Sequence, residues 1–379
     1  MQQLVLLGSG PAHLRLLARL SHQLPQGATT NIKITLISRN QQHIDAPLLS
    51  GFVAGRWPLD RCVVELEPLV QKTSTQWIES EAVALDPSAQ NLTLADGQEI
   101  RYDWLSINLE PVQNREQAER RMPGASTNGL FARPASVFCK LWPSVLALAS
   151  DKAVRVAVVC NTPLGDNVAA SASSGQSSLA LQENAGIELA LAIKQALPHC
   201  AVTLITGGAP LASASSPSMR HLLAQTLKRK NITVLADAAT AIQTGEITLA
   251  SGARLACDVP VLAIAANPPG FAAASGLSLD VQGFIAVDSR CRSLSHPTVF
   301  AAPDFDLNGE MLAQTMTAAT GLPFSSGSES RAKRVSRLQF VASSDGHAIA
   351  SWGSFSASGR LSAWLKRWVD ESRMASYRA

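Results

Sequence analysis

The chain has 379 residues, more than the roughly 150 residues common for one domain, so we expect at least two domains. Hydrophobic residues make up 46% and charged residues 16%, which allows a large apolar core and excludes global disorder. Thirty-two Lys and Arg stand against 29 Asp and Glu. A net charge of +3 is too balanced for a protein whose whole surface binds nucleic acid, so we expect no nucleic-acid partner.

The six cysteines are far apart in the sequence, and none forms a CxxC pair or a zinc-ligand spacing. We therefore expect reduced thiols, a cytoplasmic location and no metal site. No window reaches the roughly 18 apolar residues of a membrane-spanning helix. The opening Met1–Gln3 lacks the positive flank of a signal peptide, so we expect neither export nor a membrane span.

A strand, a glycine turn and a helix open the chain. The apolar run Leu4–Leu7 is followed at once by the turn Gly8–His13, and then by leucines at helical spacing between Leu14 and Leu20. A second buried strand is predicted over Ile32–Ser38. The first forty residues therefore form one βαβ unit.

An internal duplication is visible further along. A strand over Leu92–Leu94 enters an Asp-Gly turn, and residues 100–108 are predicted to return as its partner strand. The same pattern recurs 155 residues later, so that Thr93 corresponds to Thr248 and Asp103 to Asp258. A repeat of this length indicates two copies of one fold.

The predicted fold class is α/β, with two nested Rossmann-like domains, a small C-terminal β-hairpin and an amphipathic helix. The first domain comprises residues 1–115 and 280–323. The second comprises residues 116–279 and carries a low-complexity Ser-rich insert at 169–182. Residues 324–379 form a C-terminal segment for interface or membrane contact.

The glycine turn is the first candidate binding site. Glycines between a first strand and a first helix let backbone N–H groups and the positive helix end approach a pyrophosphate. The alternative is that Gly8 and Gly10 only make a tight βα turn. Ser38 occupies the place where an acidic residue usually binds a ribose, and we also place Arg39 and Val83 in the cofactor-binding set. The turn contributes these residues to the same set: Gly8, Gly10, Pro11, Ala12 and His13.

The chain resembles the pyridine nucleotide-disulfide oxidoreductase family of flavoproteins with two dinucleotide-binding domains. Within that family it is most similar to the branch near type II NADH dehydrogenases, which includes the flavoprotein-like domain fused to selenide, water dikinase in some bacteria. The resemblance covers nearly the whole chain. Four stretches carry it: Leu4–His13, Leu48–Gly55, Gly283–Asp304 and Gly353–Tyr377.

The resemblance implies bound FAD, with Asp304 on the ribityl chain, although Asp304 is equally suited to cap a helix. It places Glu188 near a nicotinamide, where the alternative is a solvated helix residue. The family's small residues after the last strand of the first copy are replaced by bulky or charged ones, Leu109 and Glu110. The glycine turn of the second copy is replaced by Cys160 to Leu164 and the Ser-rich insert, so NAD(P)H binding is doubtful.

The C-terminal helix has a stripe of five apolar residues at i, i+3, i+4, i+7 and i+8, with basic residues beside it. Such a helix at 360–379 suits an anionic membrane surface, and packing on its own domain or on a partner subunit is the alternative. From Arg331 onward the chain holds nine Lys and Arg against three Asp and Glu. The stripe consists of Leu361, Trp364, Leu365, Trp368 and Val369.

Two functions follow from these features. The first is a FAD-dependent NAD(P)H oxidoreductase that passes electrons to a quinone or another small acceptor, without a redox disulfide. Such a protein would be cytoplasmic or peripheral on the inner face of the cell membrane, and no catalytic side chain is assigned. The second is a weakly active or non-catalytic flavin- or nucleotide-binding scaffold that partners another protein in selenium metabolism.

Overall fold

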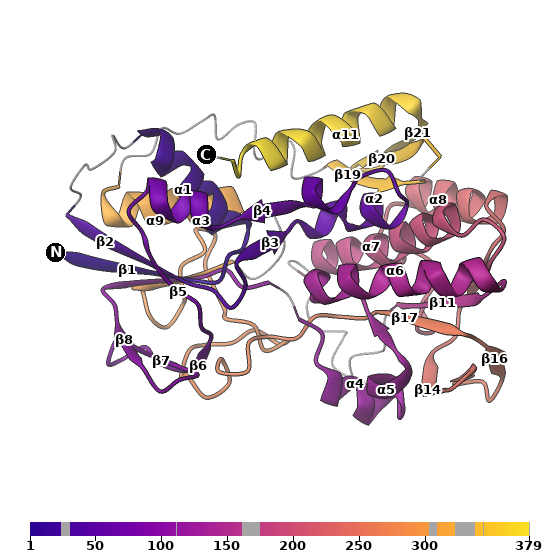
Figure 1. The fold of residues 1–379 in the computed structure, drawn as a ribbon, viewed down its shortest axis with the longest axis horizontal. Coiled ribbons are helices and arrows are strands. Elements are labelled where there is room, and N and C mark those ends of the chain that lie inside the picture. The colour runs from indigo at the N-terminus through magenta and orange to yellow at the C-terminus, as the bar shows by residue number, and fades with distance from the viewer. Residues whose placement is uncertain are drawn as a thin grey trace.

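The computed structural model describes residues 1–23, 31–110, 112–160, 175–302, 309–322, 338–343 and 345–378, with backbone alone over 175–182 (Figure 1). A parallel five-stranded sheet, in the order β18-β9-β1-β2-β5, forms the centre of the first half. Each strand is short, apolar and rich in β-branched or leucine side chains, as expected for strands covered on both faces. The strands are β1 (Gln2–Leu7), β2 (Ile32–Ile37), β5 (Gln76–Ile78), β9 (Trp104–Ile107) and β18 (Val299–Ala301).

Two different layers cover this sheet. Helices lie on one face and a three-stranded antiparallel sheet on the other (Figure 1). Alternation along β1 shows why: Leu4 and Leu6 join the helix-side core, whereas Val5 and Leu7 join the core under the small sheet. The layers are built from α1 (Pro11–Gln23), α3 (Glu67–Lys72), α9 (Gly309–Thr320), β6 (Ala82–Asp86), β7 (Asn91–Leu94) and β8 (Glu99–Arg101).

The second half repeats this architecture. Its parallel sheet has the order β10-β17-β11-β12-β13, and a second three-stranded antiparallel sheet covers one face. Three long helices cover the other face (Figure 1). The elements are α6 (Ala135–Asp151), α7 (Gly175–Ala196), α8 (Pro217–Arg229), β10 (Leu130–Phe131), β11 (Arg155–Cys160), β12 (Ala201–Ile205), β13 (Ile232–Leu235), β14 (Ala239–Gln243), β15 (Glu246–Leu249), β16 (Arg254–Ala256) and β17 (Val259–Ala263).

The two copies share details of hydrogen bonding. In the first, the Asp103 carboxylate accepts from the Gln3 amide at 2.6 Å, and the Asp103 amide donates back to the Gln3 carbonyl. In the second, Asp258 makes the same exchange with Arg155, with the carboxylate accepting at 2.8 Å. Both copies also have a β-bulge in the first strand of the small sheet. These equivalences support the duplication seen in the sequence.

The remaining elements connect and cap the two halves. The helix α11 runs along the top of the molecule, from the second half to the first (Figure 1). Near its start it packs on a small sheet, β19-β20-β21. These elements are β3 (Gln42–Ile44), η1 (Ala46–Leu48), α2 (Leu49–Val53), η2 (Leu59–Cys62), β4 (Val63–Glu65), α4 (Arg115–Arg121), α5 (Ala125–Asn128), β19 (Leu338–Ala342), β20 (Ala348–Trp352), β21 (Phe355–Gly359) and α11 (Arg360–Ala375).

The predicted fold class is confirmed, with three corrections to its elements. The run 100–108 splits between two sheets, because the chain leaves the small sheet after β8 and enters the parallel sheet at β9. The helix α7 begins at Gly175, so part of the predicted 169–182 insert is helical. The C-terminal hairpin has a third strand, β21. The domain boundaries stay a prediction.

Candidate functional site

The glycine turn lies where β1 ends and α1 begins, close to the end of β9. Gly8 has φ +95°, a conformation that L side chains rarely adopt. A Cβ at Gly10 would overlap the side chain of Asn108, the residue that follows β9. Pro11 starts the helix, where its missing N–H removes no hydrogen bond. The two glycines therefore permit a close approach of the turn to the β9 end.

Asn108 accepts hydrogen bonds from two backbone amides of this turn. Its carbonyl accepts from the Gly10 amide at 2.9 Å, and its side-chain Oδ1 accepts from the Ala12 amide at 2.9 Å. The first amides of a helix have no partner within the helix, and a ligand anion is one way to supply one. Here the buried carboxamide oxygen of Asn108 is the hydrogen-bond acceptor for the Ala12 amide. A pyrophosphate oxygen can use this amide only in place of Asn108 Oδ1.

His13 occupies the third position of the glycine motif and is fully buried. Its Nδ1 donates to the Gly8 carbonyl at 2.7 Å, so its Nε2 accepts from the Ser106 hydroxyl at 2.8 Å. Burial lowers the pKa of His13 to about 4, and the hydrogen bond to Gly8 only partly opposes this shift. The imidazole is therefore a neutral bridge between β1, α1 and β9.

The other predicted cofactor residues lie past β2 and on β6. The Ser38 hydroxyl donates to the Asn40 carbonyl at 3.0 Å, and Arg39 pairs with Glu81. Val83 lies in the β-bulge of β6 and is 52% exposed. Val83 is thus an exposed apolar side chain two residues from Glu81 of the ion pair. The apolar group suits the face of an adenine ring, and the charged groups suit its polar edge. Asp304 and the residues around it lie outside the described residues.

FAD thus fits the two ends of this region differently. For the adenosine of FAD, the chain offers the exposed Val83 side chain and the Ser38 hydroxyl oxygen. For the pyrophosphate, it offers a turn in which Gly8 and Gly10 have no side chain. The Ala12 amide, which would donate to the pyrophosphate, already donates to Asn108 Oδ1. Binding of a pyrophosphate at Ala12 and the Asn108 hydrogen bond exclude each other, and rotation of one side chain separates the two states.

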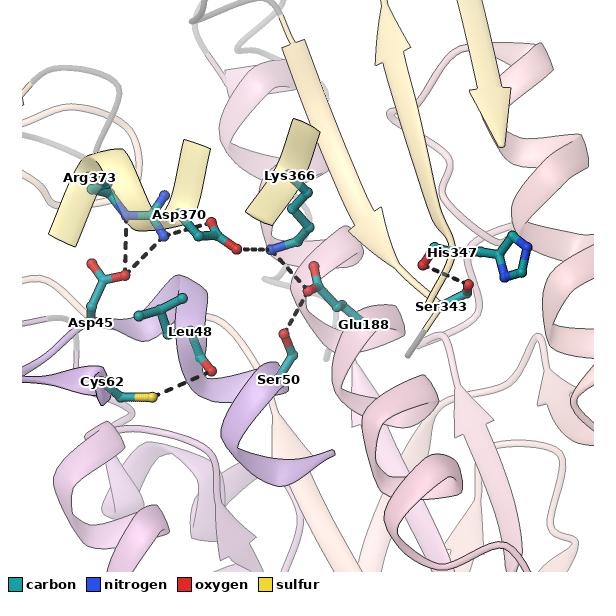
Figure 2. A network of polar contacts seen from close by, with 10 residues as sticks. All are labelled: Asp45, Leu48, Ser50, Cys62, Glu188, Ser343, His347, Lys366, Asp370 and Arg373. Carbon is teal, nitrogen blue, oxygen red and sulfur yellow. Dashed lines mark hydrogen bonds and ion pairs between the residues drawn. The ribbon is translucent and has the colours of Figure 1, made fainter. Parts of the chain in front are cut away.

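Glu188, the residue predicted near a nicotinamide, belongs to a buried network of polar contacts. It is on α7 and buried, so the solvated alternative is wrong. The Ser50 hydroxyl of α2 donates to its Oε1 at 2.6 Å, and Lys366 Nζ of α11 lies 3.3 Å from the same oxygen (Figure 2). Both donors come from other elements, α2 and α11, and they hold the Glu188 carboxylate between them.

Lys366 continues the network along α11. Its Nζ donates to Asp370 at 3.0 Å, Asp370 accepts from Arg373 at 3.0 Å, and Arg373 donates to Asp45 at 2.9 Å (Figure 2). The side chains of these four residues are at most 11% exposed. Burial lowers the pKa of Lys366, but the carboxylates of Glu188 and Asp370 outweigh burial and raise it, so the ammonium stays charged.

Neither the role of Asn108 nor this network was predicted from the sequence. Lys366, Asp370 and Arg373 are spaced i, i+4 and i+7, and this helical spacing marks a polar face opposite the tryptophans. That pattern was available in the sequence, whereas the partners Glu188 and Asp45 are set by tertiary structure. Among the described residues, no group of three His, Cys, Asp or Glu could hold a metal ion.

Comparisons with known proteins agree with this architecture. Residues 184–320 match the family model described as pyridine nucleotide-disulphide oxidoreductase. The predicted resemblance to this family is confirmed over these residues, and the branch near type II NADH dehydrogenases stays a prediction. A sulfide-quinone reductase from Aquifex aeolicus is 28% identical over 110 residues, which span 29% of this chain and 24% of that relative.

Solved structures share the fold over nearly the whole chain. The sulfide:quinone oxidoreductase of Aquifex aeolicus has a TM-score of 0.73 at 16% identity, covering 100% of this chain and 92% of that one. NDH2 of Plasmodium falciparum, solved in complex with NADH, has a TM-score of 0.69 at 13% identity, covering 100% and 96%. At these identities the similarity shows the fold alone.

His13 should make stability fall in acid. Its pKa of about 4 lies below the ordinary 6.5, so its contribution is present above pH 6.5 and is lost as the pH falls through about 4. The loss is roughly 3 kcal/mol in the free energy of unfolding. Urea unfolding from neutral pH to about pH 4 should show a shallower loss in His13→Asn, whose amide can still donate to Gly8. The control His22→Asn, at an exposed position of α1, should keep the wild-type slope; an equal slope in His13→Asn would contradict the assignment.

Proposed function

We propose that the chain is a flavin-dependent NAD(P)H oxidoreductase that passes electrons to a small acceptor such as a quinone. The observation that carries this proposal is the pair of equal Rossmann-like halves, the first with a glycine turn at the β1–α1 junction. The fold of a sulfide:quinone oxidoreductase and of an NADH-bound NDH2 over the full chain supports the same class. The electron acceptor is proposed by this similarity of fold.

When bound, FAD would supply the hydride chemistry through its isoalloxazine ring. The chain's own residues would bind and orient it. Gly8 and Gly10 leave room for a pyrophosphate, the Ala12 amide would donate to it, and Val83 would cover the adenine. Asp304 is proposed for the ribityl chain by resemblance.

NAD(P)H binding is the weaker half of this proposal. The Gly186 backbone of α7 packs so closely on Cys160 that a Cβ there would overlap the Cys160 sulfur. Glu188 is already engaged by Ser50 and Lys366, and it can turn to a nicotinamide only by leaving a buried ammonium. We therefore expect slow reduction of bound flavin by NADH or NADPH.

A second candidate function is a non-catalytic or weakly active scaffold that binds a nucleotide or a protein partner, with selenium metabolism as its proposed context. The observation that favours it is the Asn108 side chain, which gives Ala12 a hydrogen-bond partner without any ligand. The engaged state of Glu188 favours it as well. The two candidates differ in whether FAD displaces Asn108.

Asn108→Ala should strengthen FAD binding. Removal of Oδ1 frees the Ala12 amide, and one net hydrogen bond is worth about 1 kcal/mol, or roughly a fivefold to tenfold lower Kd. FAD titration followed by flavin fluorescence measures this, with Asn128→Ala of α5 as a control that removes an amide from the other half of the molecule. Anaerobic mixing with NADH then follows the loss of flavin absorbance. If neither the wild type nor Asn108→Ala takes up FAD, the scaffold candidate replaces the enzyme.

We also propose that no protein disulfide takes part in the reaction. All six cysteines are buried and unpaired with one another, and burial raises the pKa of Cys62, Cys139 and Cys160 to about 12. A thiol of this kind is a poor nucleophile near neutral pH because almost none of it is thiolate.

Native protein should therefore leave Ellman's reagent unchanged, and all six thiols should react after unfolding in guanidinium chloride. Burial excludes the reagent in the folded state, so the reaction should follow the unfolding rate. Activity, where flavin is bound, should survive treatment with iodoacetamide. Rapid reaction of two thiols in the folded protein would contradict this part of the proposal.

Attachment to a membrane surface is the proposed role of α11. The buried ion network turns its polar face inward, so the predicted stripe faces solvent: Leu361 is 77%, Trp364 62% and Trp368 44% exposed. An exposed stripe with two tryptophans beside Arg360 and Arg367 suits an anionic lipid interface. No described helix is long and apolar enough to cross a membrane. We propose a peripheral contact on the inner face of the cell membrane.

The double variant Trp364→Ser/Trp368→Ser should bind anionic vesicles roughly tenfold or more weakly, since it removes apolar area that enters the interface. Co-sedimentation with vesicles at low salt measures this. Both side chains are exposed, so the variant should keep the wild-type melting temperature. The matched control Val281→Ser/Leu294→Ser removes two other exposed apolar side chains and should bind as the wild type does. Wild-type protein that ignores these vesicles would instead favour a protein partner on the stripe.

A further inference from the structure

A cavity of about 710 Å³ lies between the α2–η2 segment, the β19–β20 connection and α11. Its floor is formed in part by Lys366 and Asp370, which belong to the buried ion network and compensate each other. Its walls carry four arginines: Arg56, Arg61, Arg360 and Arg367. Among the described residues that line this cavity, Asp370 alone has a carboxylate, and its oxygens already have two cationic partners.

The positive charge of the wall arginines is only partly balanced by carboxylates. Arg367 pairs with Glu371 at 2.9 Å on the outer side of α11. Arg56, Arg61 and Arg360 form no ion pair with any residue in the described part of the chain. Like charges that surround one cavity repel each other, and a bound anion relieves this repulsion.

Trp57 holds two of these guanidinium groups in place. The Cζ atoms of Arg61 and Arg367 lie 5.4 Å and 5.3 Å from the centre of its ring. The indole itself packs on Gly51, where any Cβ would overlap it. One aromatic ring thus positions arginines from η2 and α11, which reduces the entropy that a ligand must remove.

The start of α11 adds to the positive potential. The helix begins at Arg360, its preceding residue is Gly359 with no side-chain cap, and its first turn contains no acidic residue. Arg360 and Ala363 of this turn line the cavity. The positive end of a helix of 16 residues therefore faces the same space as the guanidinium groups.

We propose that this cavity binds a ligand that carries a phosphate group. Guanidinium groups match phosphate oxygens with paired, charge-assisted hydrogen bonds, and several arginines around one cavity suit a phosphate dianion. The same chemistry occurs in a soluble phosphorylated metabolite and in the headgroup of an anionic phospholipid. Trp364 lines the cavity and belongs to the exposed stripe of α11, so a headgroup could enter while the stripe contacts the lipid. The site goes beyond the proposed redox function and does not depend on flavin.

The test uses the full chain and two double variants of equal charge. Arg56→Gln/Arg360→Gln removes two exposed arginines that form no ion pair, so folding should be unaffected. Arg101→Gln/Arg290→Gln makes the same charge change at exposed positions outside the cavity lining. The probes are inorganic pyrophosphate, followed by calorimetry, and vesicles of equal phosphatidylglycerol and phosphatidylcholine, compared with pure phosphatidylcholine.

Saturable pyrophosphate binding that Arg56→Gln/Arg360→Gln weakens by about tenfold or more, with the control unchanged, supports a soluble phosphate ligand. Binding to phosphatidylglycerol vesicles alone, weakened to the same degree in the cavity variant only, supports a lipid headgroup. Equal losses in both double variants would mean non-specific charge attraction and would overturn the site. So would the absence of binding to both probes. Flavin content is unchanged in every case, which separates this test from that of the proposed function.

Discussion

The buried ion network on α11 is the constraint on which the upper face of the molecule depends. It connects Glu188 of the second half, through Lys366, Asp370 and Arg373, to Asp45 of the first half (Figure 2). Loss of one partner from a buried pair leaves an uncompensated charge, which costs about 3–5 kcal/mol. Only one rotation of α11 about its axis places Lys366, Asp370 and Arg373 inside together. That rotation necessarily places Trp364 and Trp368 outside.

Three functional features follow from this single orientation. The tryptophan stripe is exposed because the opposite face is needed for the charges. The cavity beside α2 has Lys366 and Asp370 of the ion network on its lining. The Glu188 carboxylate contacts Ser50 of α2 and Lys366 of α11, so it joins three elements. It would have to leave these partners to bind a ligand. A change at Lys366 would therefore affect the contact between the two halves, the cavity and the surroundings of Glu188 together.

The sequence predicted the parts of the fold that depend on local pattern. The β1–α1–β2 unit, the small-sheet hairpins, α11 and its stripe all follow from periodicity and turn residues. The break after β8 was missed because β-forming residues lie on both sides of it in the run 100–108. Only pairing shows that the chain changes sheets at Tyr102 and Asp103. The strand β21 was missed because Phe355–Gly359 is mostly small and polar. The partners of Glu188 were missed because a sequence cannot show which distant lysine a buried carboxylate contacts.

Asn108 shows how this fold separates its own stability from ligand binding. The first amides of α1 need acceptors in any folded state, since a buried amide without one costs about 1–3 kcal/mol. A turn that relied on a dinucleotide for its acceptors would be less stable whenever the ligand left. Here Asn108 Oδ1 accepts from Ala12, and the Gly10 amide donates to the Asn108 carbonyl, so both of these amides have an acceptor within the chain. Gly8 and Gly10 remain necessary with or without a ligand, because a Cβ at either position would overlap Asn108. A glycine turn in a sequence therefore indicates a close backbone approach first, and a phosphate site only where the approaching residue leaves an amide free.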